Sequence, residues 1–154
     1  MKIIEAQNKD FPAVQKIFKE YQKQLNTPIC FQNFEQELDN LQSIYASPYG
    51  AIFLALDADR VIACVAYCPH KMAQAAELKR LYVHDDYKGQ GIGKKLFLHA
   101  LNDAQKQGYK SILLETMDNM KQATSLYLQH GFKLTAPSSS NTDSDVKCYR
   151  YDFH

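Results

Sequence analysis

The sequence lacks an excess of either charge: Lys and Arg together number 18, Asp and Glu number 17, and the formal net charge is +1. A nucleic-acid-binding chain would carry a strongly basic face or composition, so the charge does not support that class. Long apolar runs are absent as well, and the longest, Val61 to Cys68, is far shorter than a membrane span. At the amino terminus, Glu5 places a carboxylate too early for a secretory signal. We therefore expect a cytoplasmic protein with neither a nucleic-acid nor a membrane partner.

Cysteine is sparse, and its spacing is not that of a zinc site. The four cysteines are Cys30, Cys64, Cys68 and Cys148. Two of them, Cys64 and Cys68, are expected to share one face of a strand. We interpret all four as buried free thiols in a reducing compartment, because a reactive thiol needs a recognisable electropositive surrounding. The five histidines show no HExxH or comparable ligand spacing, so no metal site is predicted.

A single domain is expected across residues 1–154, since the chain is long enough for one sizeable core and short for two. Hydrophobic periodicity and turn residues divide it into elements. The expected strands span residues 2–7, 51–56, 61–68, 76–83, 111–115, 132–134 and 146–153. The expected helices span residues 11–25 and 31–44, the stretch from the glycine loop to Gly108, and the stretch from a cap at Asp118 or Asn119 to His130. Residues 135–144 are expected to form a mobile loop.

The most informative segment runs from Leu81 to Leu96, where a strand leads through a short polar loop into an amphipathic helix. Three glycines on alternate residues open that helix: Gly89, Gly91 and Gly93. Glycine lets the backbone approach a ligand closely, and the first turn of a helix offers unpaired N–H groups and a positive dipole end to phosphate. Positive charge is added around the loop by Lys88, Lys94 and Lys95. The segment predicts a phosphate or pyrophosphate cradle; a plain turn would need only one or two glycines.

Two familiar phosphate loops are excluded by counting. A Walker loop needs a glycine five residues before its Gly-Lys pair, and this chain has Lys88 there and Lys95 at the Ser/Thr position. The dinucleotide fingerprint needs a third glycine where this chain has Lys94 or Leu96. Neither pattern is met.

The stretch 88–93 (Lys-Gly-Gln-Gly-Ile-Gly) resembles the acetyl-coenzyme A loop of the GNAT (general-control-related N-acetyltransferase) superfamily, Gln/Arg-x-x-Gly-x-Gly/Ala. Only the first position departs from it, because Lys88 keeps the charge of Arg but not its bidentate fork. The resemblance extends to the blocks 77–83 and 123–132 and is strong from Ala75 to Lys133. It implies an α/β (α+β) fold with a mixed, splayed sheet of about seven strands and four helices on both faces. The order of elements agrees with such a sheet.

The resemblance also implies a site for acetyl-CoA as co-substrate, whose pantetheine arm would lie where the sheet splays. The implied cofactor-binding residues are Leu81, Tyr82, Val83, Lys88, Gly89, Gln90, Gly91, Ile92, Gly93, Lys94, Asn119 and Ala123. Many relatives carry Asn three residues before the position of Ala123; this chain has Met120 there, which offers only packing, with Asn119 adjacent. On the strand before the loop, Lys79 and Arg80 are expected to alternate faces, so that at most one points toward the cofactor.

Acetyl transfer to an amine requires a base for the ammonium, donors for the developing oxyanion and a proton for the departing thiolate. The resemblance implies Tyr127 as the acid, since its neutral phenol is a donor at physiological pH. It implies Glu77 as the base, acting directly or through a water, with Glu115 on the neighbouring strand in reserve. The backbone N–H groups near residues 81–83 are implied as the oxyanion donors. The alternatives are a core tyrosine and a solvated surface glutamate.

We therefore predict an acetyl-CoA-dependent N-acetyltransferase that transfers acetyl directly to a primary amine of a small molecule. The acceptor pocket is expected to involve residues 26–30 and the loop before the last strand. Two rival functions stay open: acetylation of a protein lysine or amino terminus, and an acyl-CoA-binding sensor module without turnover. A monomer and a homodimer are equally compatible with the sequence.

Overall fold

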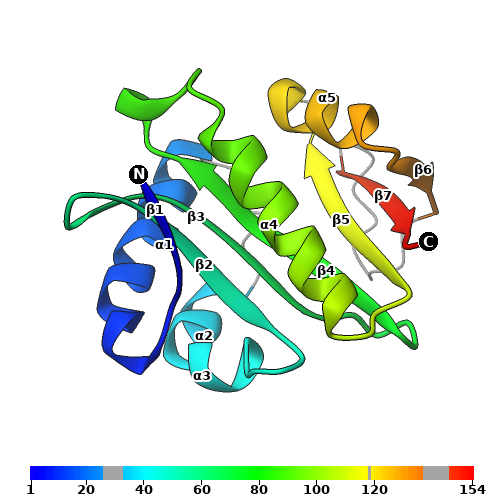
Figure 1. Cartoon of the computed structure of the whole chain (residues 1–154), viewed down its shortest axis with the longest axis horizontal. Helices are drawn as coiled ribbons and strands as arrows, with labels where there is room; N and C mark the ends of the chain where they lie inside the picture. Colours follow the sequence, from blue (N-terminus) through cyan, green and yellow to red (C-terminus); the bar gives the residue numbers. More distant parts are fainter. Residues whose placement is uncertain (26–32, 118, 137–145) are drawn as a thin grey trace.

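The computed structural model describes residues 1–25, 33–117, 119–136 and 146–154, and these form a seven-stranded mixed sheet with helices on both faces (Figure 1). The strands are β1 (Lys2–Glu5), β2 (Ala51–Asp57), β3 (Arg60–Pro69), β4 (Ala75–Val83), β5 (Ser111–Met117), β6 (Lys133–Thr135) and β7 (Val146–Asp152). The helices are α1 (Phe11–Leu25), α2 (Phe34–Asp39), α3 (Leu41–Ile44), α4 (Ile92–Lys106) and α5 (Lys121–Gln129). Two short 3-10 turns, η1 (Asn8–Asp10) and η3 (Asp85–Tyr87), precede α1 and the glycine loop. The predicted fold class is confirmed.

The strand order is β1-β2-β3-β4-β5-β7-β6, and every neighbouring pair is antiparallel except β4 with β5. That parallel contact is short. It joins Ala75 to Ser111, Ala76 to Ile112 and Glu77 to Leu113. Beyond Glu77 the two strands separate, which is the splay that the resemblance implied. In Figure 1 the gap opens toward the end of the sheet where α4 begins.

Each face of the sheet carries its own hydrophobic core. The larger core lies under α4 and α5, where the fully buried Leu96 and Phe97 of α4 pack on residues of the central strands. The second core lies under α1, α2 and α3, where Val14 and Phe18 are fully buried. The strands are therefore covered on both faces, as their near-continuous apolar sequences require.

Two expected helices differ in detail from those observed. The stretch 31–44 is not one helix, since α2 ends at Asp39 and α3 begins at Leu41. Between them Asn40 leaves the helical conformation, and its side-chain amide donates to the Gln36 carbonyl at 2.7 Å, which satisfies one acceptor at the end of α2. The start of α5 is capped by Met120 rather than Asn119, without a side-chain hydrogen bond. Four predicted features fall outside the described residues: the acceptor-pocket segment 26–30, Phe31, the alternative cap at 118, and positions 137–144 of the expected mobile loop.

Candidate active site

A β-bulge interrupts β4 just before the glycine loop. The register pairs Cys64 with Tyr82 but Ala66 with Lys79, so two residues of β4, Arg80 and Leu81, face one residue of β3. Arg80 adopts the left-handed region with φ of 62°, which is uncommon for a residue other than glycine. The strand therefore uses even-numbered residues for one face before the bulge and odd-numbered residues after it.

This bulge overturns the expected alternation of Lys79 and Arg80. Leu78 packs in the core under α4, whereas Tyr82 packs in the core under α1, although both have even numbers. Lys79 and Arg80 accordingly lie on the same face of the sheet. Their side chains approach the same Glu37 carboxylate, with nitrogen–oxygen distances of 3.8 and 2.6 Å. Neither residue lines the groove that runs past the glycine loop.

A small cavity of about 60 Å³ lies where β4 and β5 separate. Three predicted catalytic residues line it: Glu77 from β4, Glu115 from β5 and Tyr127 from α5. The remaining lining residues are Tyr21, Leu78, Lys79, Arg80, Leu81, Leu114 and Met120. The splay thus brings the predicted acid, the predicted base and its reserve to one cavity, although they are up to 50 positions apart in the chain.

Tyr127 is held by aromatic packing. Its ring centroid lies 5.4 Å from that of Phe97 and 5.8 Å from that of Phe132. Among the described residues its hydroxyl has no hydrogen-bond partner. Burial raises the pKa of this phenol well above its ordinary value. The side chain is therefore a neutral hydroxyl with a proton to donate, on the wall of the cavity.

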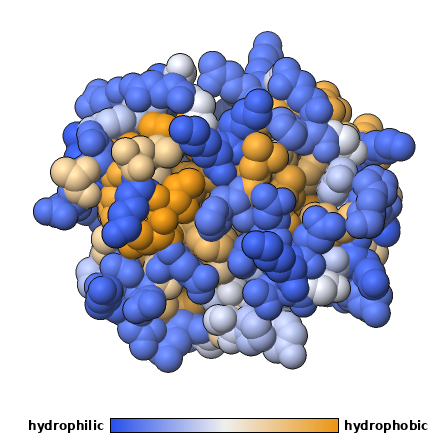
Figure 2. Space-filling model, viewed as in Figure 1, coloured by the Kyte–Doolittle hydropathy of each residue, from blue (hydrophilic) through white to orange (hydrophobic). Residues whose placement is uncertain are grey.

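A larger groove of about 440 Å³ runs alongside, from α1 past the glycine loop to α5. Its lining includes ten of the twelve predicted cofactor residues: Leu81, Tyr82, Val83, Lys88, Gly89, Gly91, Ile92, Gly93, Asn119 and Ala123. The other two, Gln90 and Lys94, are exposed and lie outside the lining. Figure 2 shows hydrophobic side chains gathered between α4 and α5, where this groove lies. Tyr21, Leu81 and Met120 line both spaces, so the groove and the small cavity adjoin.

The glycines of the loop are used in two ways. Gly89 and Gly91 have φ of 80° and 79°, and a Cβ at either position would meet nothing within 4 Å. Their backbone conformation needs glycine, while the space in front of them is open. At Gly93 a Cβ would approach Cγ2 of Val83 to 3.4 Å, so the last glycine allows α4 to pack against β4. Gly91 is the N-cap of the 15-residue α4, and the first N–H groups of such a helix suit an anion.

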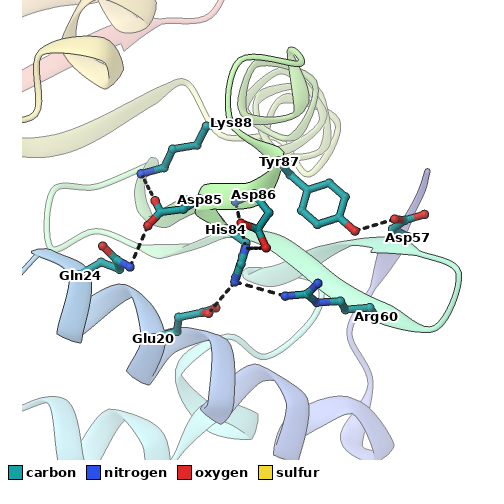
Figure 3. Close-up of polar contacts among 9 residues, drawn as sticks. All are labelled: Glu20, Gln24, Asp57, Arg60, His84, Asp85, Asp86, Tyr87 and Lys88. Atoms are coloured by element: carbon teal, nitrogen blue, oxygen red, sulfur yellow. Dashed lines mark hydrogen bonds and ion pairs between the residues drawn. The ribbon is translucent and has the colours of Figure 1, made fainter.

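Of the three lysines predicted to add positive charge beside the loop, Lys88 is paired with a carboxylate. Lys88 Nζ lies 2.7 Å from Oδ1 of Asp85, and Asp85 Oδ2 accepts a hydrogen bond from the Gln24 amide of α1 at 3.0 Å (Figure 3). The hydrogen bond with Lys88 lowers the pKa of Asp85. An anion that binds Lys88 therefore competes with a carboxylate of the protein itself.

The turn before the loop is anchored on both sides. His84 Nε2 lies 3.3 Å from the Glu20 carboxylate of α1 and 3.2 Å from the Arg60 guanidinium of the β2–β3 hairpin (Figure 3). The Tyr87 hydroxyl donates to Asp57 at 2.6 Å, and Asp57 is paired with Arg60 across the turn of that hairpin. These contacts fix the approach to the loop, so the first turn of α4 is held before any ligand arrives.

The described residues offer no alternative chemistry based on metals or thiols. Within them, no group of three or more His, Cys, Asp or Glu side chains is placed to hold a metal ion. Cys64, Cys68 and Cys148 are buried and form no disulfide within the described residues, and Cys64 and Cys68 share the core under α1 as expected. Burial raises the pKa of the Cys68 thiol to about 12, which keeps it protonated. Cys30 lies outside the described part of the chain. In the same part, no helix has the length and apolar character that would let it cross a bilayer.

A sheet that splays beside a glycine loop is typical of enzymes that take an acyl group from coenzyme A. Comparison with known proteins identifies the family: residues 11–132 match the acetyltransferase (GNAT) family, to which the chain belongs. It is an N-acetyltransferase, as the sequence predicted.

Individual relatives agree with this assignment. The chain is 31% identical to an uncharacterized N-acetyltransferase of Schizosaccharomyces pombe over 144 residues, covering 93% of this chain and 88% of that protein. An uncharacterized N-acetyltransferase of Escherichia coli is 27% identical, with 80% of this chain and 77% of the relative covered. The crystal structure of an acetyltransferase from Streptococcus agalactiae superposes with a TM-score of 0.81 at 20% identity, over 99% and 98% of the two chains.

The sequence pattern missed residues that join the two spaces. Tyr21 of α1 stacks on Tyr82 with ring centroids 5.2 Å apart and lines both the groove and the cavity. In the sequence it belongs to an ordinary apolar helix stripe, so no local signal distinguishes it. Met120 was assigned only packing, and it lines both spaces as well. The pairing of Glu37 with Arg80 has no sequence signal, because the two residues meet only in the folded chain.

Proposed function

We propose that this enzyme transfers the acetyl group of acetyl-CoA to a primary amine of a small molecule, within a ternary complex. One observation carries the proposal: Glu77 and Tyr127 line a single cavity that adjoins the groove at the glycine loop. A base and an acid on the wall of one cavity match the deprotonation of the ammonium and the protonation of the departing sulfur.

The residues fit a coenzyme A thioester. Open space in front of Gly89 and Gly91 can take the pyrophosphate at the start of α4. The apolar walls given by Val83, Ile92 and Leu126 suit the pantetheine arm. When bound, acetyl-CoA supplies an activated acetyl group.

The chain's own groups then have separate roles. Glu77 removes the proton of the acceptor ammonium, directly or through a water. The backbone N–H of Leu81, at the junction of cavity and groove, donates to the carbonyl oxygen of the acetyl group. Tyr127 gives its phenolic proton to the sulfur as the carbon–sulfur bond breaks, and the second proton of the nitrogen, released once the carbon–nitrogen bond has formed, restores the phenol. Because its ring is already packed, the hydroxyl needs no reorganisation to act.

A small acceptor is supported by the size of the cavity, about 60 Å³. Four charged residues line it: Glu77, Glu115, Lys79 and Arg80. Because both cations approach Glu37, the carboxylates of Glu77 and Glu115 favour a positively charged amine over a neutral nucleophile. We propose further that residues 1–154 act as a single N-acetyltransferase domain, as a monomer or homodimer, since one continuous sheet carries Glu77 and supports the helix that carries Tyr127.

The test is a panel of small amines and of lysine and amino-terminal peptides, incubated with acetyl-CoA, with free thiol release as the measurement. Turnover with small amines supports the proposal. Turnover with peptides alone favours the protein acetyltransferase. Acetyl-CoA binding by calorimetry without turnover of any amine would favour the sensor module and contradict the proposed reaction.

A further inference from the structure

A buried ion pair lies directly beneath the bulge of β4. Arg80 Nη2 lies 2.6 Å from Glu37 Oε1, and Arg80 Nε donates to Glu37 Oε2 at 3.0 Å, which makes a bidentate contact. The two side chains are only 5% and 6% exposed. Burial acts to raise the pKa of the Glu37 carboxyl, but the hydrogen bonds and charge of Arg80 outweigh it and lower that pKa below its ordinary value. The pair is therefore ionised.

Other groups close around the pair from separate elements. The Tyr45 hydroxyl, just after α3, donates to Glu37 Oε2 at 3.0 Å. The Arg80 guanidinium carbon lies 5.4 Å from the ring centroid of Phe34 in α2. On the backbone side, the Cys64 thiol of β3 donates to the Arg80 carbonyl at 3.1 Å. Contacts from other elements therefore fix both the side chain and the backbone carbonyl of Arg80.

The buried ion pair and the left-handed backbone of Arg80 both cost free energy of folding, and their position in β4 indicates their role. Desolvating an ion pair can cost more than the attraction returns, and a non-glycine residue at a φ of 62° is strained. Both costs fall on Arg80, one residue before Leu81. Leu81 belongs to the small set of residues that line both the cavity and the cofactor groove. A plain strand with an apolar residue at position 80 would avoid both costs and would place Leu81 on the other face.

We propose that Glu37 is a positioning residue for acetyl transfer: through Arg80 it holds the β4 bulge and so fixes the Leu81 N–H at the junction of cavity and groove. This inference rests on the proposed function for the role of that N–H, but the clamp itself is a property of the fold. It links α2 to the strand that carries Glu77.

The first test compares Glu37→Gln with Glu35→Gln, the same change on an exposed side chain of the same helix. We expect faster amide hydrogen exchange in residues 78–83 for Glu37→Gln only. We also expect a fall in kcat of about 10- to 100-fold, with little change in the calorimetric Kd for acetyl-CoA. Unchanged exchange and kcat in folded Glu37→Gln would overturn the proposal.

A second pair of variants removes both buried charges, so that neither variant leaves Arg80 unpaired: Glu37→Met/Arg80→Met and Glu37→Met/Arg80→Gly. Both lose the 3.8 Å contact of the partly exposed Lys79 equally. Apolar replacement of a buried ion pair is often neutral for stability, and only glycine takes a φ of 62° without strain. If the clamp holds the bulge, the glycine variant keeps slower exchange in β4 and a higher kcat than the methionine variant. Equal exchange and equal kcat in the two would show that the pair serves stability alone.

The experiments distinguish a failure of the proposed acetyl transfer from a failure of the proposed Glu37 clamp. A parent protein that turns over no amine refutes the transferase assignment of the site, while the exchange comparison still decides whether Glu37 holds the bulge. An active parent whose exchange is insensitive to both sets of variants refutes the clamp and leaves the proposed reaction intact.

Discussion

At the scale of single residues, Tyr127 differs from the other buried tyrosines of the described residues in its position, because it lines the small cavity between β4 and β5. Replacing it by Phe removes a hydroxyl that has no partner among the described residues, so the melting temperature should change little. Turnover should fall by about 10²–10⁴-fold, the range of general acid assistance, with acetyl-CoA affinity almost unchanged. Steady-state kinetics and calorimetry measure the two effects.

Tyr67 is the matched control for that experiment. Its hydroxyl donates to Asp103 at 2.5 Å, on the α4 side of the sheet and outside the cavity lining. Tyr67→Phe should lower stability by about 1 kcal/mol and leave kcat close to the parent value. If Tyr127→Phe behaves like Tyr67→Phe, Tyr127 is a core residue and the proton comes from elsewhere.

Glu77 and Glu115 can be separated by their pH dependence. Glu77→Gln should lower turnover at neutral pH, because the acceptor ammonium then lacks a base. The deficit should shrink at high pH, where free amine is abundant. Glu115→Gln should show a smaller loss without this pH dependence. Rates measured across the pH range decide the assignment, and a Glu77→Gln profile that parallels the parent would move the base to Glu115 or to solvent.

The residues found from the sequence are those with a local pattern. The glycines and Tyr127 stand at fixed spacings in continuous stretches, so a resemblance could locate them. Tyr21 belongs to the apolar stripe of α1, and Glu37 is one of several acidic residues in α2. Only the packing of these helices against β4 brings Tyr21 to the cavity and Glu37 to Arg80. The bulge was missed for a related reason: strict alternation is the default for a strand, and nothing in Lys79-Arg80-Leu81 signals an exception.

At the scale of elements, the loop before α4 allows a controlled test of the anion site. Gly91 and Gly108 both have positive φ, 79° and 98°, and a Cβ at either meets nothing within 4 Å. Gly91→Ala and Gly108→Ala should therefore each cost about 1–2 kcal/mol of stability. Only Gly91→Ala should weaken acetyl-CoA binding, as measured by calorimetry. Equal affinities in the two variants would contradict the placement of pyrophosphate at the loop.

The Lys88–Asp85 pair makes a further prediction for this element. Asp85→Asn should tighten acetyl-CoA binding, because the Lys88 ammonium is released for phosphate, whereas Lys88→Ala should weaken it gently. The gain should vanish when Asp85→Asn is made in the Lys88→Ala background. Calorimetry at low ionic strength, where exposed charges are least screened, measures the coupling.

Asp86→Asn is the control, since it removes the same charge from the same turn. A gain as large as that of Asp85→Asn would show that the effect is long-range charge and not release of Lys88.

The order and type of most elements could be predicted because their apolar spacing is regular. The ends of α1 and α4 agree closely with the expected ranges, since a proline in the first turn and Gly108 mark them. The break between α2 and α3 at Asn40 could not be predicted from the apolar spacing. The apolar spacing continues from Leu38 through Leu41 to Ile44, and the interruption depends on how α2 and α3 each pack beneath the sheet.

At the scale of the whole molecule, the Glu37–Arg80 pair should make stability depend on acid. Because the folded-state pKa of Glu37 lies below its ordinary value of 4.5, its contribution is present above pH 4.5 and is lost as the pH falls through the lowered folded value. Glu37→Gln should cost about 3–5 kcal/mol at neutral pH, since Arg80 is left unpaired. Its free energy of unfolding should then fall less steeply than the parent's below pH 4.5. Urea titrations at several pH values measure both, and parallel curves would contradict this account.

The narrow contact between β4 and β5 also divides the molecule's chemistry along the chain. Everything before Ser111 supplies the phosphate loop and Glu77, and everything after it supplies Tyr127 and the far side of the gap. A chain severed in the turn between α4 and β5 would yield two fragments, each with half of the proposed proton chemistry and neither competent alone. Regained turnover on mixing would then report reassembly of the core that α4 shares with β5 and α5, together with the three β4–β5 residue pairs.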